Sequence, residues 1–130
     1  MDFRTVATLG ALVTLPFGLM FLATPAQAAA LYGHVASEAY TLFMGRLFGV
    51  QLLLFGGALW ALRGAREANV QRTAAMALAS FTTLGTVVTA WGVLSGAVNA
   101  MGWTSVAVYG FFIVAWGRVA LSAGQTRAAV

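Results

Sequence analysis

The sequence predicts an all-α membrane protein, in which the whole chain of 130 residues forms one antiparallel bundle of four transmembrane helices. Three observations predict this fold. The chain is 61% hydrophobic and only 8% charged, whereas about a quarter of the residues in a soluble domain are charged. Four apolar stretches are long enough to cross a bilayer, and the arginines lie in alternate connections between them. A surface this apolar requires lipid as its solvent.

The four predicted spans cover residues 5–24, 40–62, 73–95 and 103–121. Inside hydrocarbon every backbone amide has to be paired within its own segment, so apolar runs of this length favour helices. None of the runs alternates between polar and apolar residues, as a membrane β-strand does. Pro16 lies inside the first span and predicts a kink there, because proline removes one helical hydrogen bond.

The distribution of arginine predicts the orientation of the spans. Six of the arginines lie near one set of span ends: Arg4, Arg63, Arg66, Arg72, Arg118 and Arg127. The connections near residues 25–39 and 96–102 contain no arginine. By the positive-inside rule, both termini and the connection at residues 63–72 are cytoplasmic. Trp60 and Trp116 fit the inner interface, where amphipathic aromatic rings gather.

The segment FLATPAQAAALYGH, residues 21–34, leaves two interpretations of the first span. Pro25 and the small residues at positions 26 and 28 favour removal of residues 1–28 as a secretory signal peptide. A signal peptide, however, has a basic start and an apolar core of about 7–15 residues. Here Asp2 offsets Arg4, and the apolar run is longer than that core. We therefore expect the first helix to be retained.

Glycines at helical spacing predict where the helices pack. Helices in a bilayer associate through close packing, and small residues let their backbones approach. The candidates are Gly45, Gly49, Gly56, Gly92, Gly96, Gly110 and Gly117. They predict seams within the bundle, and the alternative is a face that docks a second copy or another membrane subunit.

The third span carries Thr82, Thr86 and Thr89 along one face. Threonine in a membrane helix usually bonds a preceding carbonyl of its own helix, and a polar lining for a small cavity is the alternative. Gln51 lies near the middle of the second span, where its amide needs a partner. The threonines are candidates for that interhelical hydrogen bond.

Arg46 lies about six residues inside the outer end of the second span. An arginine within the membrane is unfavourable unless it reaches the headgroups or a polar partner. The structural interpretation is that Arg46 reaches outward or pairs with Glu38. The functional hypothesis is that Arg46 binds an anionic ligand or a lipid phosphate in an outward-facing pocket.

His34 and Glu38 are four residues apart and share a helical face if the second helix begins early. One histidine and one carboxylate are too few for a metal site, which normally has three or four protein ligands. We expect an outer-surface pair, with His34 as an axial ligand of a porphyrin-type pigment as the alternative. No metal or other cofactor is predicted.

Composition excludes several classes of function. The chain has no cysteine, one histidine and three carboxylates, which excludes disulfides, thiolate chemistry and a bis-histidine haem within this chain. No catalytic grouping or phosphate-binding loop is present, so no catalytic residue is predicted and we do not expect an enzyme. The arginines form no basic stripe of the kind that contacts nucleic-acid phosphates, so nucleic acid is not an expected partner.

The segments LPFGLMFLATPAQAAALYGH and LFMGRLFGVQLLLFGGALWALRG resemble, in layout, small bacterial four-helix membrane proteins of unknown function, some of which are DoxX-like proteins associated with quinone-linked complexes. The resemblance implies a four-helix antiparallel bundle, and it carries over only Arg46 and the glycines that follow it. The small multidrug transporters are similar in size, but they need a glutamate in their first helix. Here the first span has no carboxylate.

These observations predict a non-catalytic accessory or scaffold subunit of a larger assembly in a bacterial inner membrane. Its expected partners are membrane lipids and another membrane protein or a second copy of itself. The alternative is a small binding or transport protein that holds a lipid-like or anionic ligand beside Arg46, Gln51, Thr86 and Thr89. A filled interior with an exposed groove of small residues on the lipid face favours the scaffold, whereas an internal cavity that opens outward beside Arg46 favours the binding protein.

Overall fold

The computed structural model describes residues 1–35 and 38–128, with side chains described up to residue 123. The side chain of Arg127 therefore lies outside the described residues. The described residues form five helices and no strand: α1 (Phe3–Ala23), α2 (Pro25–Leu31), α3 (Ala39–Leu62), α4 (Ala68–Leu94) and α5 (Gly102–Ala128). Four of them, α1, α3, α4 and α5, are long and apolar enough to cross a membrane, which confirms the prediction of four such helices.

The start of α1 is fixed by an N-cap. An oxygen of the Asp2 carboxylate accepts a hydrogen bond from the Thr5 amide at 2.9 Å, which satisfies one of the donors left free at a helix start. Hydrogen bonds from the side chain and then the backbone of Thr5 lower the pKa of Asp2. This cap is therefore fully formed above the ordinary carboxylate pKa and weakens as the pH falls through the lowered value.

The connection after α1 contains a helix that the sequence interpretation missed. We expected residues 25–39 to be a loop, but Pro25–Leu31 forms α2. Pro25 occupies the first turn of α2, where the missing amide hydrogen costs nothing because that donor has no partner in a helix start anyway. Gly33 follows with φ of +85°, a left-handed conformation that suits glycine and turns the chain away from α2.

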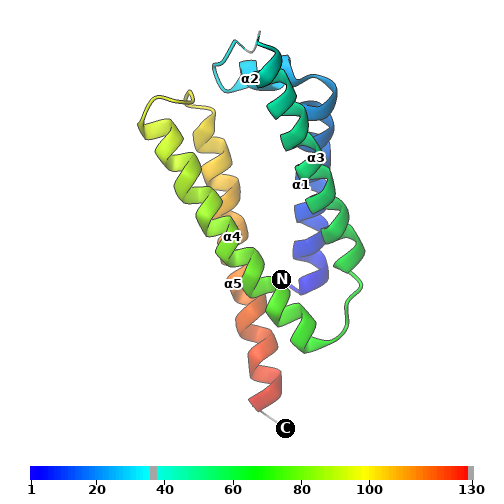
Figure 1. Ribbon diagram of the computed structural model, residues 1–130. Helices are drawn as coiled ribbons and strands as arrows, with labels where there is room; N and C mark the ends of the chain where they lie inside the picture. Colours follow the sequence, from blue (N-terminus) through cyan, green and yellow to red (C-terminus); the bar gives the residue numbers. More distant parts are fainter. Residues whose placement is uncertain (36–37, 129–130) are drawn as a thin grey trace.

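The long helices pack as two pairs. α1 lies along α3, and α4 lies along α5, as Figure 1 shows. The pairs are joined through α1 and α5, whereas α3 and α4 have marginal contact at most. Figure 1 also shows the two pairs diverging toward the end of the molecule that carries α2, which we call the α2 end, and converging toward the end that carries the N-terminus, the N-terminal end.

Glycine lets α1 and α3 approach closely. A Cβ atom at Gly49 would lie 2.5 Å from the backbone nitrogen of Leu22 and 2.8 Å from the carbonyl oxygen of Gly18. A Cβ atom at Gly56 would lie 2.6 Å from the hydroxyl of Thr14. Since real Cβ atoms do not come this near to a neighbouring backbone, only glycine at position 49 permits this helix spacing.

The other glycines singled out in the sequence have different surroundings. Gly45 faces Pro25 at 3.0 Å, and Gly92 faces Val98 at 3.5 Å. Gly96 lies in the turn after α4 with φ of +75° and open space around its Cβ position, so it packs against no other helix of the described chain. No described atom lies within 4 Å of the Cβ positions of Gly110 and Gly117, so neither forms a seam within the described chain.

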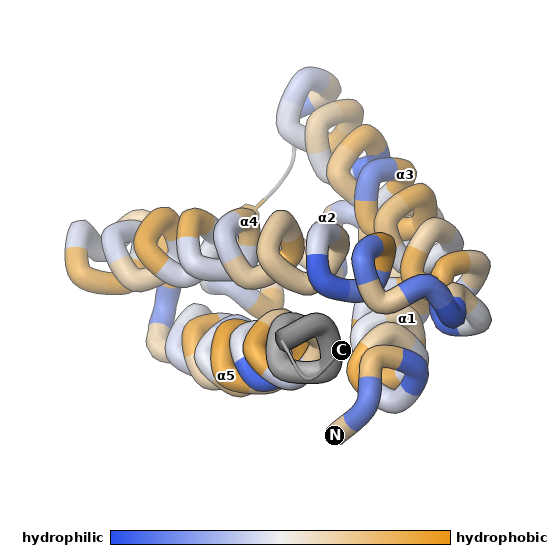
Figure 2. The backbone as a smooth tube through the Cα atoms, turned by 90° about the horizontal axis from the view of Figure 1, so that it is seen from below, coloured by the Kyte–Doolittle hydropathy of each residue, from blue (hydrophilic) through white to orange (hydrophobic). Residues whose placement is uncertain are grey.

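All four long helices meet in a core at the N-terminal end. Its buried residues are Phe3, Val6, Ala7, Ala11, Leu59, Ala75, Phe112, Ala115, Trp116 and Val119. Trp116, which the sequence places near the inner membrane boundary, is only 2% exposed, and its ring packs against Phe3. Figure 2, seen from this end, shows hydrophobic and intermediate residues alternating along the helices, and hydrophilic residues near the N-terminus and the α3–α4 connection.

Candidate functional site

A pocket of about 280 Å³ lies between the two helix pairs. It is lined mainly by apolar and aromatic side chains that come from α1, α3, α4 and α5, with Tyr32 and Met101 from the connections: Val13, Thr14, Phe17, Phe21, Tyr32, Phe48, Leu52, Phe55, Phe81, Thr82, Gly85, Met101, Thr104, Ser105, Val108 and Tyr109. The pocket exists because α3 and α4 diverge, so that neither covers the joined faces of α1 and α5.

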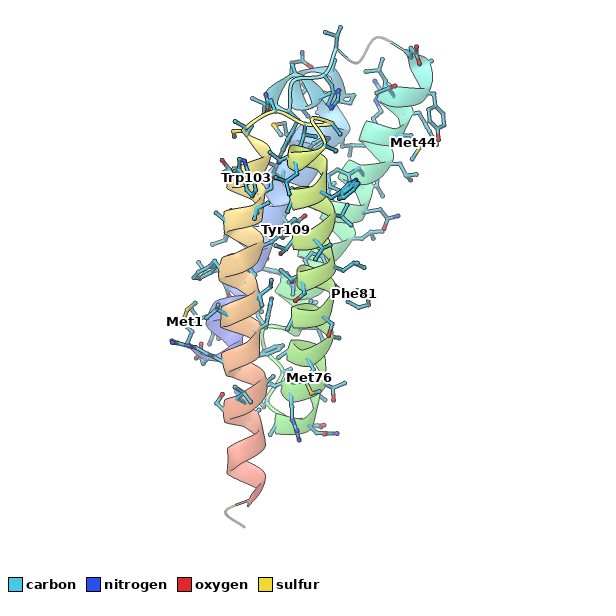
Figure 3. The ribbon with its side chains drawn as sticks, turned by 90° about the vertical axis from the view of Figure 1, so that its left-hand side faces the viewer. Met1, Met44, Met76, Phe81, Trp103 and Tyr109 are labelled. Atoms are coloured by element: carbon cyan, nitrogen blue, oxygen red, sulfur yellow. The ribbon has the colours of Figure 1, made fainter. Side chains whose placement is uncertain are left out.

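The mouth of the pocket lies between α3 and α4. Its lining residues on these helices include Phe48 and Phe55 of α3 and Phe81 of α4, all of which are exposed. Phe81 is 71% exposed and points outward from α4 in Figure 3. The residues contributed by α5, by contrast, are mostly half-buried, as Val108 and Tyr109 are. A molecule in the surrounding lipid therefore meets the pocket from the side, through a gap flanked by phenylalanines.

A smaller pocket of about 60 Å³ continues toward the N-terminal end. The two pockets share six lining residues: Val13, Thr14, Phe55, Thr82, Val108 and Tyr109. The smaller one also reaches Gly10, Leu59, Phe112 and Trp116. Together the two pockets form one elongated site that is wide at the α2 end and narrow where it reaches the core.

Aromatic contacts shape the wide part of the site. The rings of Phe21 and Phe48 meet edge to face with centroids 5.0 Å apart, and Phe21 also lies 6.5 Å from Tyr32. On the opposite wall, the ring of Tyr109 lies over Gly85, whose Cβ position is 3.5 Å from the ring. Figure 3 shows Tyr109 between the ribbons of α5 and α4. Gly85 and Tyr109 thus pack against one another in this wall.

The polar groups of the site are hydroxyls, and most of them are already bonded. Thr14 and Thr82 each donate to a carbonyl of their own helix. The hydroxyls of Tyr32 and Ser105 are 3.0 Å apart and bond one another, and the hydroxyl of Thr104 lies 3.8 Å from the sulfur of Met101. The hydroxyl of Tyr109 has no hydrogen bond to any residue in the part of the chain that the structure describes.

The site contains no charged side chain. Among the described residues, neither pocket is lined by Asp, Glu, Arg or His, and no group of three or more metal-ligating side chains is present. A buried charge without a partner is strongly unfavourable in an apolar environment. The site therefore suits a neutral, largely apolar occupant.

Two connections close the α2 end of the site. The amide of Asn99 donates to the carbonyl of Tyr32 at 3.1 Å, and the side-chain nitrogen of Asn99 donates to the carbonyl of Leu31 at 3.1 Å. The Asn99 side-chain oxygen also accepts from the amide of Met101. With the Tyr32–Ser105 bond, these contacts tie the connection after α2 to the connection between α4 and α5, so both helix pairs are held at this end.

The residues expected to form a ligand site do not line this pocket. Arg46 and Gln51 are exposed on α3 and lie outside both pockets. Thr86 and Thr89 donate to the carbonyls of Thr82 and Gly85 within α4. They therefore bond their own helix, as threonine in a membrane helix usually does. Gln51 makes no hydrogen bond to these threonines in the described structure, because α3 and α4 diverge instead of packing together.

The expected outer-surface pair is also separate from the pocket. His34 and Glu38 are exposed at the α2 end, on either side of residues 36–37, which lie outside the described residues. Among the described residues no ion pair joins Glu38 to Arg46. The charged residues of the α2 end thus lie apart from the aromatic site between the helix pairs.

Sequence reasoning missed Tyr109 and the phenylalanines of the pocket. Their pattern does not indicate a pocket, since aromatic residues are common in membrane helices and pack equally well against lipid or a neighbouring helix. One indication was present: Ser105, Tyr109, Phe112 and Trp116 recur at helical spacing along one face of the fourth span. No protein family, curated protein or solved structure matches this chain at a significant level.

Proposed function

We propose that the four long helices cross a bacterial inner membrane as an antiparallel bundle, with both termini in the cytoplasm. The distribution of arginine supports this orientation, because Arg4 and the three arginines of residues 63–72 belong to the N-terminal end. Arg63 also stacks on Trp60, with its guanidinium carbon 3.3 Å from the ring centroid. Such an arginine–tryptophan pair suits a membrane interface, where both side chains are partly wet.

Single cysteines test this orientation cleanly, since the chain has no cysteine of its own. We expect Ala97→Cys, in the exposed connection between α4 and α5, to react with a membrane-impermeant maleimide in intact cells. Gly64→Cys, which has open space around its Cβ position, should react only after the membrane is permeabilised. Labelling in the opposite order would reverse the proposed orientation.

We infer that the protein binds a lipid-like molecule in the pocket between its helix pairs. The observation that carries this proposal is the pocket itself, an apolar space of about 280 Å³ flanked by exposed phenylalanines of α3 and α4. Ligand pockets are usually about 300–1,000 Å³ in volume and mainly apolar with a few polar groups. A space of this kind loses van der Waals contacts unless an apolar group fills it.

The position of the mouth supports lateral entry from the bilayer. α3 and α4 form the rim, and both are long enough to cross the hydrocarbon region. A molecule that already resides in lipid reaches such an opening without leaving an apolar environment. The role is non-catalytic, and the occupant is held, presented or passed on in the membrane.

A second candidate is an accessory subunit that packs against a larger membrane assembly or a second copy. The observation that favours it is the surface of α4, which spans 27 residues and buries only Ala75. The face of α4 that points away from α5 is thus left for lipid or for a partner helix. The unfilled space between the helix pairs nevertheless favours the binding role over a scaffold with a packed interior.

The binding role is tested by filling the pocket with a larger side chain. Leu52 lines the pocket, whereas Leu54 on the same helix is 63% exposed and does not. Native mass spectrometry of the protein, gently extracted from its own membrane, should detect a small lipid on the original protein and on Leu54→Trp. Leu52→Trp should lose that lipid, because the indole occupies its space.

Thermal unfolding of both variants in detergent provides the control for folding. A protein that carries no lipid but retains another polypeptide would contradict the binding role and support the accessory role. A lipid that survives Leu52→Trp would show that the bound molecule lies elsewhere on the surface.

A further inference from the structure

We infer that the occupant is a neutral single-chain amphiphile, whose hydroxyl or carbonyl headgroup bonds Tyr109 and whose chain runs toward Trp116. This inference rests on the proposed binding role and specifies its ligand class, its orientation and the residue that recognises the headgroup. It depends on the charge, the hydrogen bonding and the shape of the two connected pockets.

Because the described lining residues are uncharged, the site favours a neutral headgroup. No described lining residue carries a charge, and Arg46 lies outside both pockets. An anionic or cationic headgroup placed beside Tyr109 would have no counter-charge, and burial of an unpaired charge is far more costly than burial of a hydroxyl. A neutral headgroup beside Tyr109 therefore replaces the anionic ligand beside Arg46 that the sequence suggested.

The hydroxyl of Tyr109 supplies the specific contact. The other lining hydroxyls, those of Thr14, Tyr32, Thr82, Thr104 and Ser105, each have a partner within the described protein. A phenol both donates and accepts, so Tyr109 is able to bond either an alcohol or a carbonyl. In a pocket that is otherwise mainly apolar and whose other hydroxyls already have partners, this group distinguishes an amphiphile from a plain hydrocarbon.

The shape of the site gives the direction and the number of chains. Tyr109 and Trp116 are seven residues apart on one face of α5, about 10 Å along the helix. Between them the site narrows from the larger pocket to one of about 60 Å³, bounded by Leu59, Phe112 and Trp116. This narrow part suits the end of one flexible chain, whereas a branched or two-chain tail would not fit beside Phe112.

Fluorescence of Trp116 provides the readout. Trp60, Trp91 and Trp103 are all exposed, so replacing them with Phe leaves Trp116 as a single buried reporter. Trp116 is 2% exposed, so bulk lipid does not reach it, but a chain in the narrow pocket does. Bromine quenches tryptophan on contact, and brominated dodecyl compounds in nanodiscs therefore serve as probes.

We expect 12-bromododecan-1-ol to quench Trp116 saturably and to bind about three- to tenfold more tightly than 1-bromododecane, the range expected for one hydrogen bond. Tyr109→Phe should abolish that preference and leave binding of the bromoalkane unchanged. Tyr40→Phe is the matched control, since Tyr40 is exposed on α3 and lies outside both pockets. 2-Bromododecan-1-ol, with bromine beside its hydroxyl, should quench Trp116 less at saturation.

The outcomes separate this inference from the proposed binding role. If no probe quenches Trp116 saturably, the binding role itself fails. If the alcohol and the bromoalkane bind equally, or if the preference survives Tyr109→Phe, the pocket binds chains but Tyr109 does not recognise the headgroup. Stronger quenching by 2-bromododecan-1-ol would reverse the orientation. Tighter binding of 12-bromododecyl sulfate or 12-bromododecyltrimethylammonium would show that the site takes a charged headgroup.

Discussion

Gly49→Ala is expected to lower the free energy of unfolding by about 3 kcal/mol or more. Overpacking usually costs about 1–3 kcal/mol when side chains are able to move aside. Here the added methyl group would meet the backbone of α1 instead, at 2.5 Å from the nitrogen of Leu22 and 2.8 Å from the oxygen of Gly18. Relief requires α1 and α3 to separate, which loses contacts along their whole seam.

Gly57→Ala is the matched control for this variant. Gly57 lies on the same helix, but no described atom is within 4 Å of its Cβ position. Alanine is about 1 kcal/mol better than glycine in a helix interior, so this variant should be neutral or slightly more stable. Unfolding in mixed micelles titrated with sodium dodecyl sulfate, followed by circular dichroism, measures both. Equal losses of stability at the two positions would mean that the close α1–α3 approach is not the cause.

Trp116→Ala is expected to lower the free energy of unfolding by about 3–5 kcal/mol, the usual range for removing a large buried aromatic side chain. Trp116 is 2% exposed, packs against Phe3 and belongs to the core that joins all four long helices. In a bilayer the loss comes mainly from van der Waals contacts, because a helix surface gains little from being hidden from lipid.

Trp91→Ala tests whether this loss is specific to the core. Trp91 is 72% exposed on α4, so its removal should change stability by less than about 1 kcal/mol, as is typical of surface substitutions away from special contacts. The same detergent titration compares the two variants. A loss at Trp91 as large as the loss at Trp116 would indicate that the surface of α4 is covered in the native state, and would support a partner on that helix.

The contacts tested at Gly49 and Trp116 both involve α1, so they are relevant to whether this helix is retained. α1 contributes Phe3, Val6, Ala7 and Ala11 to the core and the backbone against which Gly49 packs. Removal of residues 1–28 as a signal peptide would take away these contacts together with the α1 wall of the pocket. Retention of α1 stays a prediction. The mass of the mature protein, measured by the native mass spectrometry described above, tests it directly.

Hydropathy alone determined the number and approximate bounds of the long helices, because lipid forces every apolar run of this length to pair its backbone internally. The predicted span at residues 40–62 differs from α3 (Ala39–Leu62) by one residue, whereas α4 begins at Ala68 instead of Thr73. The start of α4 was missed because Arg72 and Gln71 reduce the local hydropathy although the helix continues through them.

Only the tertiary structure decided which helices pair, where the space between them lies and which side chains line it. Lipid and protein interior are equally apolar, so a membrane helix carries little periodic pattern to reveal its buried face. No periodic pattern therefore indicated that Trp116 is buried in the core, or that Gly96, Gly110 and Gly117 have open space around their Cβ positions within the described chain. Likewise, the sequence indicated the charged Arg46 as the ligand site, whereas the pocket is lined by Tyr109 and formed by the divergence of α3 from α4, which no local pattern encodes.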